Sequence, residues 1–141
     1  IFPFCSPQLP QKKWPYFNDL IKIIKSKHIN LEIAIAPGPD EIEEAKKVQA
    51  VSITNNNKSL NITELTGLIL KASFVIANDT GPAHIAAHVG KSGVALFGYH
   101  TTAEKVSIET EKFKAITEKD LNNLSADRVY SLIKDRLNLI N

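Results

Sequence analysis

The sequence has no methionine, one cysteine and no apolar run long enough to span a bilayer. A single thiol, Cys5, excludes an internal disulfide framework and is typical of a reducing compartment, and we expect it to be a small buried apolar side chain. A transmembrane helix needs about 18 or more consecutive apolar residues, and neither end of the chain has a signal-peptide pattern. We therefore expect a cytoplasmic protein with no membrane span.

The chain also lacks a large excess of charge of either sign. Its 17 Lys and Arg residues and 15 Asp and Glu residues give a formal net charge of +2. This balance argues against nucleic acid as a partner, and any anion site must be local. With 43% hydrophobic residues, the 141-residue chain has the composition of one globular domain with its own core. Because it opens on the strand-like "IFPF" and has no methionine, we expect it to be a domain of a longer protein.

Apolar strands and amphipathic helices alternate along the sequence. Strands are predicted at residues 1–5, 31–36, 51–54, 74–77 and 93–97. Helices are predicted from Trp14 to His28, at 41–49, 62–70 and 82–89, and after Ser125. The continuous apolar run 74–77 is typical of a parallel strand covered on both faces. The alternation predicts a doubly wound, Rossmann-like α/β fold over residues 1–141.

The stretch "NDTGPAH" joins a predicted strand to a predicted helix. Free N–H groups of the first helical turn then point past the carboxyl end of the sheet, where anions bind. Asp79 or Thr80 can cap the helix, Gly81 leaves room for a ligand, and Pro82 suits the first turn. His84 adds a titratable imidazole beside these amides. Most turns of this kind bind nothing, so on its own this one is explained more simply by a plain cap and a surface histidine.

Two other strand ends carry groups that suit a nucleotide. "SPQLPQKKWP" places Ser6 and two lysines before a helix, where Lys12 or Lys13 can reach a phosphate. "PGPDE" places Glu41 at a helix start, where its carboxylate can accept hydrogen bonds from ribose hydroxyls. The plain alternatives are a solvated basic loop and a helix cap. Because carboxyl ends of parallel strands meet at one edge of a sheet, we expect the three turns to converge.

The sequence suggests neither a metal site nor a bound cofactor. It contains no carboxylate cluster and no His/Cys set with ligand spacing. His28, His88 and His100 are too scattered along the chain to predict ligands.

Three segments in this order, "KKWP", "PGPDE" and "FVIANDTGPAHIAAHVGKSGVALFG", resemble the carboxyl-terminal half of the ADP-heptose:lipopolysaccharide heptosyltransferases, glycosyltransferase family nine. The similarity covers nearly the whole chain, and the Asp-Thr-Gly-Pro-x-His core is its most specific part. The resemblance implies a GT-B architecture of two Rossmann-type domains facing each other across a cleft. This chain would be the second, donor-binding domain, and the acceptor domain would be absent from it.

The resemblance also implies roles for the residues in the three turns. The diphosphate and sugar of the donor would lie against Lys12, Asp79, Thr80, Gly81 and His84, with Ser6 beside them. Glu41 would bind the ribose, and Trp14 would pack rather than contact the donor. No catalytic residue is expected in this chain, because the family resemblance places the general base, an aspartate, in the other domain.

By this resemblance the chain would belong to an inverting glycosyltransferase that takes a heptose from ADP-heptose to a lipopolysaccharide or related surface-glycan acceptor. The isolated domain would be inactive. The full-length protein would lie peripherally at the inner face of the inner membrane, where it meets a lipid-linked glycan. Two alternatives stay open: a nonenzymatic module that binds nucleoside diphosphates, and a nucleotide-sugar epimerase of similar architecture.

The chain departs from the family pattern at two places. Phe4, Cys5 and Ser6 stand where family members have a small glycine-containing turn, so the donor is not expected to approach that backbone as closely. After "ALFG", the loop "YHTTAEK" replaces the usual proline and Thr-Asp-Pro and brings in Tyr99 and His100. These changes allow a donor other than ADP-heptose.

Overall fold

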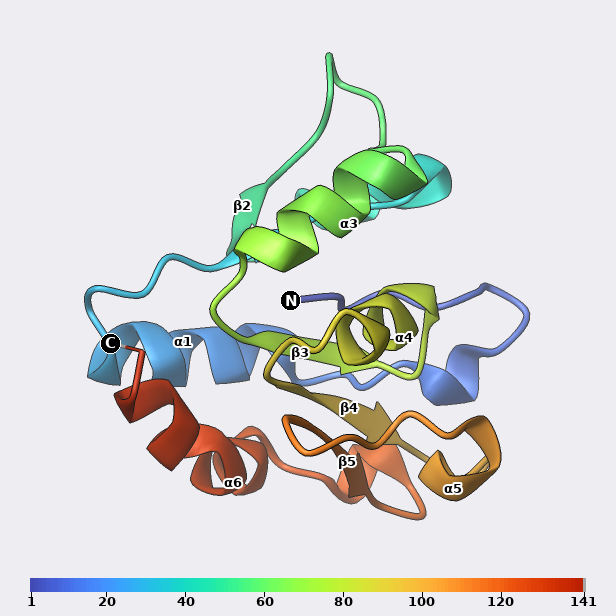
Figure 1. Ribbon diagram of the computed structural model, residues 1–141, viewed down its shortest axis with the longest axis vertical. Coiled ribbons are helices and arrows are strands. Elements are labelled where there is room, and N and C mark those ends of the chain that lie inside the picture. The colour runs from blue at the N-terminus through green and yellow to red at the C-terminus, as the bar shows by residue number, and fades with distance from the viewer. Residues whose placement is uncertain (141) are drawn as a thin grey trace.

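The computed structural model describes residues 1–140 and consists of parallel strands with helices on both sides (Figure 1). The helices are α1 Phe17–Lys27, α2 Ile42–Ala45, α3 Ile62–Lys71, α4 Gly81–His88, α5 Ala103–Val106 and α6 Ala126–Asn138. The strands are β1 Ala34–Ile35, β2 Val51–Ser52, β3 Val75–Asn78, β4 Gly93–Phe97 and β5 Phe113–Thr117. Short 3₁₀ turns span Pro10–Lys12, Pro39–Glu41 and Leu121–Asn123.

The strands form two parallel groups, β1–β2 and β3–β4–β5. The first two residues of the chain join them. Phe2 donates its amide to the Ile76 carbonyl at 2.9 Å and accepts from the Asn78 amide at 3.1 Å. On the other side, the amino group of Ile1 donates to the Ala34 carbonyl at 2.6 Å. The spatial order is therefore β2, β1, residues 1–2, β3, β4, β5, which is the Rossmann order with its switch point between residues 1–2 and β3.

Alternate residues of the central strands face two separate cores. Ile76 and Leu96 pack with α1 and α6 on one face of the sheet, and these two helices lie side by side (Figure 1). Ala77 and Phe97 pack on the other face with α3 and α4. Both faces of the sheet are thus buried, as the continuous apolar run of β3 predicts. The predicted doubly wound arrangement is confirmed.

Several predicted elements are confirmed, and others are shorter than expected. β4 and α6 have the predicted positions, with Ser125 capping α6 through a 3.2 Å bond from the Arg128 amide. The predicted strand 1–5 is reduced to the single bridge at Phe2, and the predicted strand 31–36 to β1. α1 begins at Phe17 rather than at Trp14. Trp14 precedes Pro15, and the residue before a proline disfavours helical backbone. The Trp14 side chain is buried and donates its indole Nε1 to the Leu124 carbonyl at 2.6 Å, which confirms its packing role.

Candidate functional site

The three predicted turns meet at the carboxyl edge of the sheet, beside the switch point. A pocket of about 220 Å³, here named the switch-point pocket, lies between them. Ser6, Glu41 and Thr80 all line it, one from each turn. The rest of its wall is largely apolar and is made of Phe2, Phe4, Cys5, Ala36, Pro37, Gly38, Leu60, Leu65 and Pro82. Ligands of open α/β sheets bind at this position in the fold.

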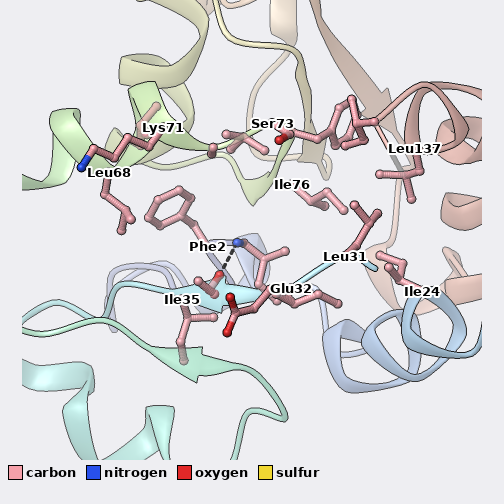
Figure 2. A pocket seen from close by; sticks show the side chains of 18 of the residues that line it. Phe2, Ile24, Leu31, Glu32, Ile35, Leu68, Lys71, Ser73, Ile76 and Leu137 are labelled. Atoms are coloured by element: carbon pink, nitrogen blue, oxygen red, sulfur yellow. Dashed lines mark hydrogen bonds between the residues drawn. The ribbon is translucent and has the colours of Figure 1, made fainter. Parts of the chain in front are cut away.

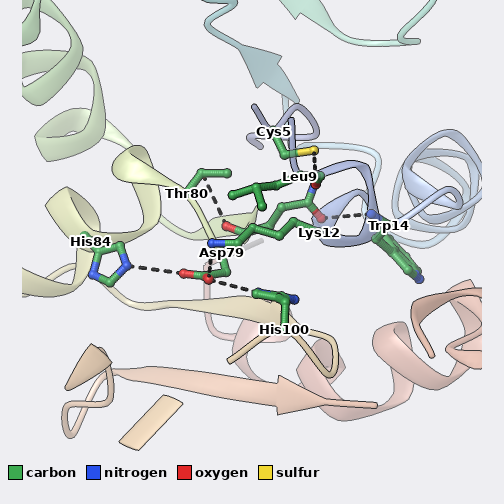
Figure 3. Close-up of polar contacts among 9 residues, drawn as sticks. Cys5, Leu9, Lys12, Trp14, Asp79, Thr80, His84 and His100 are labelled. Atoms are coloured by element: carbon green, nitrogen blue, oxygen red, sulfur yellow. Dashed lines mark hydrogen bonds and ion pairs between the residues drawn. The ribbon is translucent and has the colours of Figure 1, made fainter. Parts of the chain in front are cut away.

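Next to this pocket, the Asp79 carboxylate lies at the centre of a polar group that we name the Asp79 cluster (Figure 3). Lys12 Nζ lies 2.8 Å from Oδ2 of Asp79, and His100 Nε2 lies 3.0 Å from the same oxygen. His84 Nε2 lies 3.3 Å from Oδ1. The side chain of Asp79 is only 3% exposed. The fold thus joins Lys12 and Asp79, which are 67 residues apart in the sequence.

The surroundings of Asp79 favour its ionised form. Burial raises the pKa of its carboxyl group, but the hydrogen bonds from Lys12, His100 and His84 and the charge of Lys12 together lower it more. The pKa of Asp79 therefore lies below its ordinary value. A carboxylate in this state only accepts hydrogen bonds, so each partner nitrogen must carry a proton toward it. The cluster pairs one fixed anion with a lysine that can also reach a ligand.

Lys12, not Lys13, is the lysine of this site. Lys13 pairs with Glu44 of α2, and both side chains are exposed. Ser6 lines the switch-point pocket and donates to the side chain of Gln8. Reasoning from the residues alone left the choice between the two lysines open, because it does not show which way each one points, whereas the family resemblance implied Lys12.

Asn78, which sequence reasoning did not assign to the site, connects the first turn to the end of β3. Its side chain is completely buried. Its Nδ2 donates to the Pro3 carbonyl at 2.9 Å, and its Oδ1 accepts from the Trp14 amide at 3.1 Å. These two bonds hold both ends of the loop that carries Lys12 next to Asp79. A polar residue at the end of an otherwise apolar strand was the available signal in the sequence.

The start of α4 corrects the predicted cap. Thr80 occupies the N-cap position, but its hydroxyl bonds the Asn78 carbonyl at 3.3 Å, and it accepts no bond from a helical amide. Asp79 does not cap either, because its oxygens face Lys12, His84 and His100. Gly81 is exposed, and a Cβ atom built there meets no protein atom within 4 Å. The space beside Gly81 is therefore open, as a ligand against this helix end requires.

Glu41 caps the turn at Pro39–Glu41, which was the alternative to ribose binding in the sequence analysis. Its Oε2 accepts from the Gly38 amide at 2.7 Å. Burial is the main reason that the pKa of Glu41 lies above its ordinary value. Its other oxygen, Oε1, has no hydrogen-bond partner among residues 1–140. Capping and ligand binding are therefore compatible at Glu41.

Cys5 is only partly buried, so the prediction of a fully buried thiol was wrong. It follows Phe4 into the loop at the switch point, where it lines the pocket instead of the core. Its Sγ donates to the Leu9 carbonyl at 3.4 Å (Figure 3). Burial is the main reason that the pKa of the Cys5 thiol lies above its ordinary value.

A second cavity, of about 420 Å³, lies at the opposite, amino edge of the sheet (Figure 2). Its lining is predominantly apolar and includes Ile24, Leu31, Ile76 and Leu137. A diphosphate needs several converging hydrogen-bond donors, and the polar residues of the three turns converge at the other edge. The smaller switch-point pocket is therefore the better candidate for a nucleotide.

The remaining histidines lie outside the Asp79 cluster. His28 is buried, with Nε2 3.0 Å from the Tyr130 hydroxyl, and His88 Nδ1 lies 2.8 Å from the His84 carbonyl. Within the described chain, no three His, Cys, Asp or Glu side chains are arranged to hold a metal ion. None of the helices in residues 1–140 combines the length and apolar character needed to cross a membrane.

Comparison with known proteins identifies the family. The family model described as glycosyltransferase family 9 (heptosyltransferase) matches residues 1–129. The chain belongs to glycosyltransferase family 9. The resemblance found in the three sequence segments is thereby confirmed.

Among curated family 9 proteins, the lipopolysaccharide core heptosyltransferase OpsX of Haemophilus influenzae is 32% identical over 101 residues. The match covers 68% of this chain and 29% of that protein. This family 9 chain thus spans less than a third of the curated relative.

Two solved structures share the fold. The Escherichia coli heptosyltransferase WaaC with ADP-2-deoxy-2-fluoro heptose has a TM-score of 0.78 at 19% identity, over 95% of this chain and 41% of that one. The E. coli ADP-heptose lps heptosyltransferase II has a TM-score of 0.78 at 15% identity, over 96% of this chain and 45% of that one. At these identities the likeness establishes the fold alone: this family 9 chain has the α/β fold of one part of the GT-B heptosyltransferases.

Proposed function

We propose that this chain is the donor-binding domain of an inverting glycosyltransferase that transfers a heptose from ADP-heptose to a lipopolysaccharide or related surface glycan. One observation carries the proposal: the Asp79 cluster, the open start of α4 and the switch-point pocket adjoin one another at the carboxyl edge of the sheet. Charge, the free Gly81 amide at the positive end of a helix, and a partly apolar cavity together suit a nucleoside diphosphate. The solved WaaC structures, which hold ADP or an ADP-sugar analogue, support this choice of ligand.

In this proposal each part of the site takes one part of the donor. The Lys12 ammonium and the first amides of α4, at Gly81, bind the diphosphate, with the Ser6 hydroxyl beside it. His84, which is 32% exposed and is held by the buried Asp79, faces the sugar, and Glu41 accepts from the ribose through its free Oε1. The adenine ring of the donor lies in the apolar part of the switch-point pocket, between Pro37, Leu60 and Leu65.

The proposed chemistry is stabilisation of the departing diphosphate. As the bond between sugar and phosphate breaks, negative charge grows on the phosphate oxygens. The positive end of the α4 dipole and the Lys12 ammonium both lie at this edge of the sheet, where they can stabilise that charge. We assign no general base to this chain. We place the catalytic general base and the lipid-linked acceptor site in a second domain. That acceptor would bring the full-length protein peripherally to the inner face of the inner membrane.

A titration with ADP tests the donor site. The amide signals of Thr80, Gly81, Ala83 and His84 are expected to shift in heteronuclear NMR spectra of this chain at up to millimolar ADP. The phosphate would bind at the Gly81 N–H, and the Ala83 and His84 amides, which donate to the Thr80 carbonyl, would report the change beside them. The valine side chain of Gly81→Val enters open space in the free protein, so this variant should fold normally and lose most of the ADP response. Unshifted signals in the native chain, or full binding by Gly81→Val, would count against the site.

A transfer assay separates the proposal from its alternatives. In a protein that carries this chain with a second domain, ADP release should require both ADP-heptose and an acceptor glycan. Conversion of the donor without an acceptor would instead indicate an epimerase. Binding without any turnover would indicate a nonenzymatic module.

Cys5 provides a chemical probe of the same pocket, since it is the only cysteine in the sequence. The thiolate is the form that reacts with maleimides, and the pKa of this thiol is raised by burial. Alkylation near pH 7 should therefore be severalfold slower than in the unfolded chain, and it should accelerate as the pH rises beyond the ordinary range of a thiol. Saturating ADP should slow it further. Equal alkylation rates with and without ADP would place the nucleotide elsewhere.

A further inference from the structure

His100 is the one member of the Asp79 cluster that no sequence pattern predicted. It belongs to the loop after β4, where this chain departs from the family pattern. The loop returns the imidazole to the centre of the site, with Nε2 3.0 Å from Oδ2 of Asp79 (Figure 3). The role of His100 therefore has to come from its own contacts.

The His100 ring packs beside Phe97 and Gly98 at the end of β4. The ring stacks on Phe97, the last residue of β4, with centroids 6.3 Å apart and an interplanar angle of 12°. Phe97 is itself completely buried. The backbone at Gly98 lies close to the opposite ring edge, since a Cβ atom there would be 3.4 Å from Nδ1 of His100. The imidazole is thus held in one orientation toward Asp79.

The three partners of Asp79 differ in their freedom to move. The side chain of His100 is 5% exposed, whereas those of Lys12 and His84 are 20% and 32% exposed. Lys12 shares Oδ2 of Asp79 with His100. If the Lys12 ammonium is drawn to a diphosphate, Oδ2 still accepts from His100. The buried carboxylate then avoids the large cost of losing every partner on that oxygen.

The second ring nitrogen of His100 indicates which protonation state of the ring donates to Asp79. Nδ1 is buried and has no hydrogen-bond partner among residues 1–140. An imidazolium would leave a charged N–H unpaired there, whereas the neutral tautomer with the proton on Nε2 leaves only a lone pair. The neutral tautomer donates to Asp79 without adding charge. Lys12 therefore stays the only cation on Oδ2.

We propose that His100 is a positioning residue that, as the neutral Nε2–H tautomer, holds the Asp79 carboxylate in place and thereby lets Lys12 turn its charge to the donor diphosphate. This inference rests on the proposed function. Without His100, Asp79 depends on Lys12 for Oδ2, and withdrawing Lys12 toward a ligand becomes less favourable. The donor should then bind more weakly although no group that touches it has changed.

Three variants at position 100 test this role through the ADP dissociation constant of this chain, measured by calorimetry. H100F keeps an aromatic ring on Phe97 but has no donor, and it should raise the dissociation constant about tenfold. H100Q has an amide N–H that reaches the place of Nε2, and it should restore most of the affinity. The asparagine side chain of H100N is too short to reach Asp79, so this variant should bind ADP as weakly as H100F. It replaces H100F in the test if H100F does not fold. Leu132→Ala, a change at a 58% exposed residue of α6, should leave the affinity unchanged.

The outcomes separate this inference from the proposed function. If H100F and H100N bind ADP as tightly as the native chain does, the proposed role of His100 is wrong, but the donor site still stands. A native chain that binds no ADP would overturn the donor site and this inference with it. The ¹⁵N chemical shifts of the His100 ring in the free chain give a readout that needs no ligand. They should report the neutral Nε2–H tautomer, and an imidazolium or an Nδ1–H tautomer would contradict the proposal.

Discussion

Lys12→Met is expected to lower the rate of sugar transfer by about 100-fold, because in the proposed mechanism it removes the ammonium assigned to stabilise charge on the departing diphosphate. Methionine keeps most of the length of the side chain, so the packing of the Pro10–Lys12 turn is preserved. The loss should be seen in kcat, measured as ADP release in a protein that carries this chain with a second domain, as the proposed function requires. The dissociation constant of ADP should also rise, because a charge-assisted hydrogen bond is lost.

The neighbouring lysine provides the matched control. Lys13→Met removes the same charge one residue further along the chain, but from an exposed ion pair with Glu44. Exposed ion pairs of this kind contribute about 0 to 1 kcal/mol, so transfer should change little. Similar losses in both variants would indicate a general effect of charge. Unaltered transfer in Lys12→Met would show that the assigned role is wrong.

Asn78→Ala is expected to lower the free energy of unfolding by about 2 to 6 kcal/mol. The variant leaves the Trp14 amide and the Pro3 carbonyl without their partner, and each such unpaired buried group costs about 1 to 3 kcal/mol. Chemical denaturation followed by circular dichroism measures this change. A typical domain is stable by only about 5 to 15 kcal/mol, so the effect is large.

The same substitution should weaken ADP binding under conditions where the variant is folded. The loop that carries Lys12 is attached to the end of β3 through Asn78, so its release separates Lys12 from Asp79. Asn138→Ala, at an exposed position of α6, is the matched control and should alter neither stability nor affinity. Loss of stability with native affinity would show that Asn78 supports the fold without positioning the site.

The elements that the sequence predicted well are those whose signals are local. β4 is a five-residue buried run, and the Ser125 cap marks the start of α6. β5 was missed because it is an edge strand: buried Phe113 and Ile116 alternate with exposed Lys114 and Thr117 in a segment rich in charged residues. A half-exposed strand of this kind has no continuous apolar run to detect.

The candidate site was predictable as far as its turns, but not in its side-chain partners. The position of Asp79 and Gly81 after a buried strand follows from local sequence, as does the convergence of the three turns. The choice of Lys12 over Lys13 depends on which side chain faces β3, 67 residues away. His100 reaches Asp79 only because the chain turns back after Phe97. No spacing rule encodes that reversal.

The central place of residues 1–2 in the sheet has a consequence for folding. These residues complete their pairing only with β3, and the contact between Pro3 and Asn78 spans 75 positions of the chain. At a synthesis rate of about 5 to 20 residues per second, the apolar "IFPF" segment leaves the ribosome roughly 4 to 15 seconds before its partner strand. Such long-range pairing slows folding. The nascent chain therefore exposes this segment to chaperones, and to aggregation, until the β3–α4 region has been made.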